Sequence, residues 1–174
     1  MILKAKERGN APQLARYLLA MRDNEHVELH DVRGFISDDL VEAFGEADAI
    51  ARGTRCEKHL FSMSFNPPEG ANASIEDFEK AIEQVEAKLG LEGQPRAIVF
   101  HEKDGRRHAH AVWSRIDSER MRALNLSHYK IKLRDVSRQL YIDHGWAMPR
   151  GLEDRRLRDP RTFSREEWQQ AQRA

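Results

Sequence analysis

One Asp-Gly pair constrains the fold of this chain more than any other sequence feature. Asp104 and Gly105 are flanked by alternating apolar runs, and this pattern is the strongest short-range signal for a two-residue β-hairpin turn. With this turn, His101 lies directly opposite His108. Because side chains alternate between the two faces of a strand, His110 shares the face of His108. The sequence therefore predicts a hairpin with three imidazoles on one surface.

These three histidines are candidate metal ligands. Directly opposed residues have Cβ atoms roughly 4.5–5.5 Å apart, so His101 and His108 can reach one ion with His110 as a diagonal neighbour. Neutral imidazole is the commonest protein ligand for divalent ions, and three of them leave coordination positions open for a substrate. Mg²⁺, Mn²⁺ and Zn²⁺ are all possible, and the ligand type favours the softer ions. The alternatives are solvent-facing histidines without a ligand, or a closed structural zinc site with a fourth ligand.

The opposite face of the hairpin is apolar. It carries Ile98, Phe100, Ala109, Ala111 and Trp113. We expect helices to pack on this face while the histidine face stays open, and we expect Trp113 to belong to the core.

The rest of the chain alternates between helical and strand patterns. Asn10 followed by Pro12 is typical of a helix start, and one inward face of this helix carries Leu14, Tyr17, Leu18 and Met21. The other expected elements are a strand over 26–32, a helix after residues 37–39, a strand over 59–65, a helix from Ser74 with a solvated acidic outer face, the hairpin, a short edge strand within 116–126 and a helix over about 130–144. This order predicts an α+β domain with helices on one face of an antiparallel sheet and the histidines on the other.

Composition limits the class of protein. A chain of 174 residues is long enough for one domain with a core. The 29 basic and 29 acidic residues give no net charge, which argues against non-specific coating of nucleic acid. Basic residues nevertheless predominate from Arg106 to Arg161. With Cys56 alone no internal disulfide can form, and without a secretory start or a membrane-length apolar run we expect a cytoplasmic protein with no membrane insertion.

The histidine hairpin resembles a motif of a known enzyme family. A single histidine, a short turn, His-x-His, a small apolar run and an arginine are similar to the third motif of the conjugative and mobilization relaxases, the VirD2/MobA-like HUH endonucleases. The resemblance implies that His101, His108 and His110 hold a divalent metal against the scissile phosphate of single-stranded DNA. Lys103 stands where the family often has an acid, and Ser114 where it often has Asn, so the ligands match while part of their supporting shell does not.

The resemblance also implies roles for residues outside the histidines. Relaxases carry their nucleophilic tyrosine in an N-terminal segment, which implies Tyr17, whereas the inward helix face by itself favours a core tyrosine. Ser64 begins a Ser-Phe-x-Pro segment similar to the family's second motif and is expected to contact DNA, as is Arg115, which closes the third. The bases expected to bind DNA phosphates on the following helix are Lys130, Lys132 and Arg134.

The fold and activity that the resemblance implies are those of a DNA relaxase. The fold is a five-stranded antiparallel HUH or ferredoxin-like palm in a single domain over 1–174, with its core at about 10–148 and a basic loop and helix over 149–174. The activity is metal-dependent cleavage and strand transfer at an origin of transfer, through a covalent 5′-phosphotyrosine, during mobilization of a plasmid or other mobile element. The implied partners are single-stranded origin DNA, accessory relaxosome proteins and a type IV secretion coupling protein.

Two related functions stay open at this point. A rolling-circle replication initiator shares the histidine motif, but its tyrosine usually follows the histidines, so Tyr141 would be its nucleophile; Tyr129 is the remaining tyrosine. A non-catalytic DNA-binding relaxosome module would keep the fold without cleavage, and the neutral charge is consistent with it.

Overall fold

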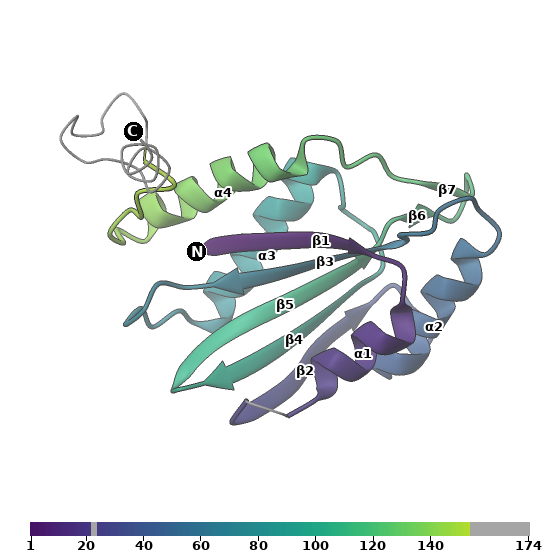
Figure 1. The fold of residues 1–174 in the computed structure, drawn as a ribbon, viewed down its shortest axis with the longest axis horizontal. Coiled ribbons are helices and arrows are strands. Elements are labelled where there is room, and N and C mark those ends of the chain that lie inside the picture. Colours follow the sequence, from purple (N-terminus) through teal and green to yellow (C-terminus); the bar gives the residue numbers. More distant parts are fainter. Residues whose placement is uncertain (22–23, 154–174) are drawn as a thin grey trace, which may run out of the picture.

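A five-stranded antiparallel sheet forms the centre of the computed structural model, which describes residues 1–21 and 24–153 (Figure 1). Its strand order is β1-β3-β5-β4-β2. The strands are β1 (Ile2–Arg8), β2 (His26–Arg33), β3 (Leu60–Asn66), β4 (Arg96–Lys103) and β5 (Arg106–Ser114). The predicted α+β class and five-stranded antiparallel sheet are confirmed. The predicted C-terminal helix falls on residues outside the described ones.

The β4–β5 hairpin has the predicted register. His101 is the cross-strand partner of His108, and Asp104 and Gly105 form the turn with φ angles of 52° and 65°. A two-residue turn with positive φ at both positions matches the twist of the two strands, and glycine adopts this conformation without steric cost. The turn chemistry therefore places the histidines at the closed end of the hairpin.

Helices α3 (Ile75–Leu89) and α4 (Tyr129–Asp143) cover the apolar face of the sheet. Helix α3 begins with a capping box between Ser74 and Asp77, which satisfies backbone N–H groups at the helix start. Apolar side chains of both helices belong to one buried cluster with the hairpin residues Phe100 and Trp113. Trp113 is fully buried, so its predicted place in the core is confirmed.

Helices also lie on the histidine face, where we expected none. Helices α1 (Ala11–Leu19) and α2 (Leu40–Ala51) pack on Ala97, Val99 and Val112. All three share the face of the histidines: Val99 is the cross-strand partner of His110, and Ala97 and Val112 form the next pair on this face, further from the hairpin turn. This part of the face is apolar, and burying it stabilises the fold. The helices therefore cover the apolar part of this face, on the side of the sheet where β2 and β4 lie (Figure 1).

The fifth strand of the sheet is β1, at the N-terminus, and not a segment of residues 116–126. In that region β6 (Ile116–Asp117) and β7 (Arg122–Ala123) pair only with each other. Strand β1 pairs along its whole length with β3, so the sheet begins ahead of residue 10, the expected start of the core. None of the helices within 1–21 and 24–153 has the length and apolar character needed to span a bilayer.

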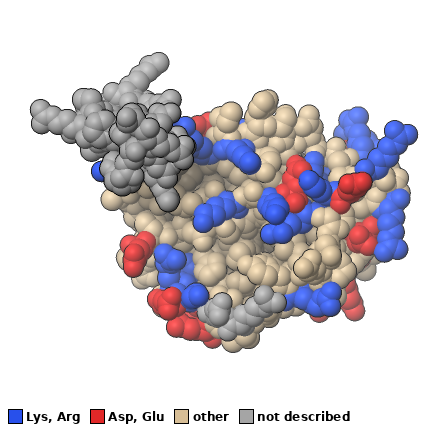
Figure 2. All heavy atoms as spheres, in the orientation of Figure 1, with Lys and Arg blue, Asp and Glu red and all other residues tan. Residues whose placement is uncertain are grey.

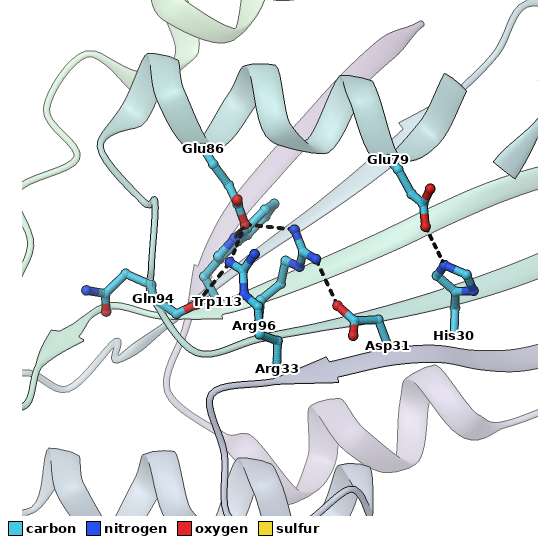
Figure 3. Close-up of polar contacts among 8 residues, drawn as sticks. All are labelled: His30, Asp31, Arg33, Glu79, Glu86, Gln94, Arg96 and Trp113. Carbon is cyan, nitrogen blue, oxygen red and sulfur yellow. Dashed lines mark hydrogen bonds and ion pairs between the residues drawn. The ribbon is translucent and has the colours of Figure 1, made fainter. Parts of the chain in front are cut away.

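A buried polar network joins α3 to three strands (Figure 3). Glu86 of α3 accepts hydrogen bonds from Trp113 Nε1 at 2.7 Å, Arg33 Nη2 at 2.9 Å and Arg96 Nη1 at 2.9 Å. Arg96 also donates to Asp31 at 2.8 Å. The expected solvation of the acidic face of this helix is therefore wrong for Glu86, which is buried because the three donors need an acceptor.

Candidate active site

The three histidines form one compact cluster at the closed end of the hairpin. One potential ligand atom from each of His101, His108 and His110 lies within 4.8 Å of the other two. The ring centroids of His101 and His110 are 4.6 Å apart, and both rings lie 5.4 Å from that of His108. The cluster could therefore bind a metal.

The protonation state of the cluster also suits a metal. The pKa of His110 is lowered to about 3, mainly by burial and to a smaller extent by the neighbouring His101 and His108. Burial is likewise the main cause that lowers the pKa of His101 and His108 below the ordinary value. A metal binds the neutral imidazole, so the low pKa values keep the lone pairs of the cluster available near neutral pH.

The end of α1 orients His101. The Nε2 of this almost fully buried side chain donates to the Leu18 carbonyl at 2.7 Å, because a carbonyl oxygen can only accept. Its Nδ1 then has the lone pair, and it accepts from Asn24 Nδ2 at 3.3 Å. The hydrogen bond to Leu18 leaves Nδ1 as the nitrogen that could bind a metal, and the metal would then replace the Asn24 amide at this atom. The same bond holds α1 close to the histidine cluster.

Tyr17 lies beside this cluster and is exposed, so the inward position that we predicted is wrong. Leu14 and Leu18 are buried as expected, but 51% of Tyr17 is accessible to solvent. Helix α1 has nine residues, and Tyr17 lies at the edge of its apolar face. At this position the side chain of Tyr17 lines a groove of about 210 Å³. Tyr17, His110 and Ser64 line the same groove. Within the described residues, the Tyr17 hydroxyl has no hydrogen-bond partner.

The other two tyrosines lie on the far side of the sheet. Tyr129 and Tyr141 belong to α4, whose apolar residues pack on the face opposite to the histidines. Tyr129 packs edge-on against Phe61 at a ring distance of 5.2 Å. Tyr141 is buried, and burial raises the pKa of its hydroxyl. Of the three tyrosines, only Tyr17 shares a groove with a histidine of the cluster.

Ser64 and Arg115, both expected to contact DNA, have different surroundings. Ser64 is the cross-strand partner of His110 and lines the groove, with its Oγ accepting from Asn66 at 3.1 Å. Arg115 is 9% exposed, and its terminal nitrogens bind the carbonyls of Lys58 and Leu124 and the Glu7 carboxylate. The structure therefore does not support the predicted DNA contact of Arg115, which instead holds loops against β1.

The predicted basic residues of α4 lie outside this groove. Lys130 and Arg134 are exposed and Lys132 is half-buried, on a helix that packs against the opposite face and beside β1. Their contact with DNA stays a prediction.

Three basic residues of β1 were not among the predicted DNA contacts. Lys4, Lys6 and Arg8 are exposed and line the groove together with Tyr17 and His110. Figure 2 shows basic side chains gathered over β1 in the middle of this face. These basic residues alternate with Leu3, Ala5 and Glu7, and this two-residue period was the sequence signal for a strand with one basic face.

Replacement of His101, His108 or His110 by alanine is expected to weaken the binding of Mn²⁺ and Zn²⁺ by at least about tenfold, since each change removes one lone pair from the cluster. Calorimetric titration of each variant measures this loss. His26→Ala is the matched control, because His26 is an exposed histidine on the neighbouring strand β2. Unchanged affinity in all three cluster variants would exclude this metal site.

The comparison with protein families identifies the chain. A comparison with curated proteins finds no match. The family described as "Relaxase: MobA/VirD2-like, nuclease domain" matches residues 17–146, a segment that begins at Tyr17, contains the histidine hairpin and extends past α4. This match covers most of the chain, and the three-histidine cluster lies within it. The chain therefore belongs to the MobA/VirD2-like relaxase family and contains its nuclease domain.

Proposed function

We propose that this domain is a DNA relaxase that cleaves one strand at an origin of transfer and later rejoins it, during mobilization of a plasmid or another mobile element. The observation that carries the proposal is the shared groove of Tyr17 and His110, beside a cluster of three neutral imidazoles. Family membership implies DNA as the substrate. A hydroxyl next to a candidate metal site is the arrangement that phosphoryl transfer to a side chain requires.

The residues that would hold the divalent ion are His101, His108 and His110. The donor set fits, because the three rings are close together, are kept neutral by burial and include one that is oriented by the Leu18 carbonyl. Three nitrogen ligands are compatible with Mn²⁺ or Zn²⁺ and, less favourably, with Mg²⁺. When bound, such an ion stabilises the negative charge that develops on a phosphate under attack.

Tyr17 supplies the nucleophile in this proposal. Its Oη loses a proton and attacks phosphorus, the bond from phosphorus to the 3′ oxygen breaks, and that oxygen takes up a proton. The products are a 5′-phosphotyrosyl enzyme and a strand with a free 3′-OH. One phosphate ester replaces another, so the strand can be rejoined by the reverse reaction. The exposed position of Tyr17 gives DNA access to this hydroxyl.

A replication initiator that uses a tyrosine after the histidines is less consistent with the structure. Its nucleophile would be Tyr129 or Tyr141, and α4 holds both on the opposite face of the sheet from the histidines. In the proposed role the domain acts in the cytoplasm, with accessory relaxosome proteins and a type IV secretion coupling protein as partners.

Covalent capture of DNA tests the proposed activity. The domain is incubated with Mn²⁺ and a single-stranded oligonucleotide that contains the origin of transfer of its own element. We expect a species that resists denaturation and has the mass of the protein plus the 5′-phosphorylated product strand less one water, and chelation of the metal should abolish it. A protein that binds this oligonucleotide but forms no such species with any divalent metal would be a binding module and not an enzyme.

A further inference from the structure

Strand β1 presents a row of positive charge on the histidine face. Its backbone pairing with β3 places Lys4 opposite Ser64, Lys6 opposite Ser62 and Arg8 opposite Leu60. The next strand, β5, places His110 opposite Ser64. Lys4, Ser64 and His110 therefore form one cross-strand row, and Lys6 and Arg8 follow in the next two rows.

These charges are not neutralised by neighbouring acids. Among the described residues, no carboxylate forms an ion pair with Lys4, Lys6 or Arg8. The one acid of the strand, Glu7, points to the opposite face and binds Arg115 at 3.1 Å. Such a row of exposed basic side chains without acidic partners attracts an anion. Binding of the anion stabilises these side chains more than it would stabilise basic side chains that already have an acidic partner.

The spacing of the row suits a polyanion that starts at the histidine cluster. Neighbouring strands are about 4.8 Å apart, which puts the β1 backbone about 10 Å from that of β5, within reach of a lysine side chain. Successive basic residues along β1 are about 6.7 Å apart, since each residue of a strand advances about 3.3–3.4 Å. Phosphates of an extended single strand recur at a comparable interval. Ser62 and Ser64 belong to β3, which lies between the basic residues of β1 and His110 of β5. Both serines line the same groove and can donate or accept hydrogen bonds there.

We propose that Lys4, Lys6 and Arg8 form a phosphate-binding rail, which holds the single-stranded DNA next to the phosphate that is cleaved. The identity of the polyanion as DNA rests on the proposed function. The rail residues are positioning residues, because their place on the edge strand puts them two strands away from the histidines. They should therefore determine how tightly the strand binds and leave the chemical step at saturating DNA unchanged.

The test is a triple variant, Lys4→Gln, Lys6→Gln and Arg8→Gln, in the full chain. Fluorescence anisotropy with a labelled single-stranded oligonucleotide, without metal, measures affinity as a function of salt. Each lost phosphate contact reduces the slope of log K against log salt by about 0.7, so the triple variant should lose about 2 from this slope. The rate of adduct formation at saturating DNA should match that of the parent, while the DNA concentration for half the maximal rate should rise.

Two further triple variants act as controls. Lys80→Gln, Lys88→Gln and Arg120→Gln together remove the same charge at exposed positions outside the groove and should retain most of the parent slope. Lys4→Arg, Lys6→Arg and Arg8→Lys together keep the charge and should restore the parent slope. If the glutamine triple variant does not fold, Lys6→Gln alone should still reduce the slope by about 0.7.

The outcomes separate this inference from the proposed function. If the folded glutamine variant has the same salt slope and the same affinity for DNA as the parent, the proposed rail is wrong, whether or not the parent forms an adduct. If the glutamine variant loses salt slope but the parent forms no adduct, the result would support the rail and contradict the relaxase activity. A parent that binds no single-stranded DNA would contradict both.

Discussion

Replacement of Tyr17 by phenylalanine is expected to abolish covalent attachment of DNA and to leave the fold and metal binding intact. The change removes only the hydroxyl, which has no hydrogen-bond partner among the described residues and belongs to a side chain that is 51% exposed. The free energy of unfolding should therefore change by less than about 0.5 kcal/mol. Adduct formation should fall to background, because α4 holds Tyr129 and Tyr141, the other two tyrosines, on the opposite face of the sheet from the histidines. Adduct assays, urea unfolding and calorimetry measure the three properties separately.

Tyr129→Phe and Tyr141→Phe are the matched controls, and both should retain adduct formation. If the adduct persists in Tyr17→Phe and disappears in either of these variants, the domain is still a tyrosine transesterase but its nucleophile follows the histidines. If the parent forms an adduct that none of the three variants removes, the nucleophile is not a tyrosine.

The histidine cluster was predictable from the sequence because local chemistry determines it. The Asp104–Gly105 turn sets the register of two adjacent strands, and the two-residue period then decides which side chains share a face. Both rules depend only on residues close in sequence. The structure reproduces the predicted partners His101 and His108.

The surroundings of the cluster depend on contacts between distant segments and were predicted less well. Helical periodicity grouped Tyr17 with Leu14 and Leu18, but the position of α1 on the sheet decides that Tyr17 faces a groove. Arg115 matched a family motif, yet its burial depends on Glu7 and Leu124 in other parts of the chain. Neither fact can be read from a local pattern.

The rail residues were missed for a similar reason. A short strand with alternating bases, such as β1, has few apolar residues and resembles a solvated segment until its partner is known. Pairing with β3 makes β1 an edge of the sheet and turns Lys4, Lys6 and Arg8 toward the histidine face. Their function, as we propose it, depends on this pairing.

The buried network at the open end of the hairpin carries the largest expected effect on stability. Arg96 and Trp113 are cross-strand partners at the end of β4 and β5 that lies away from the histidines, and Glu86 binds both. Glu86→Ala leaves two guanidinium groups and an indole N–H without this acceptor. Removal of one partner of a buried ion pair typically costs about 3–5 kcal/mol, and the partial exposure of Arg33 places the expected value toward the lower end of this range. Urea unfolding at neutral pH measures the loss.

Glu83→Ala is the matched control, because Glu83 lies on the same helix and is exposed. This variant should change the free energy of unfolding by no more than about 0.5 kcal/mol. Glu86→Gln keeps one acceptor oxygen and removes the charge, so we expect its loss to lie between those of the two alanine variants. A domain is stable by only about 5–15 kcal/mol, so Glu86→Ala should shift the urea midpoint strongly. A loss below about 1 kcal/mol would mean that water replaces the carboxylate and that packing of α3, not this network, holds the open end of the histidine hairpin.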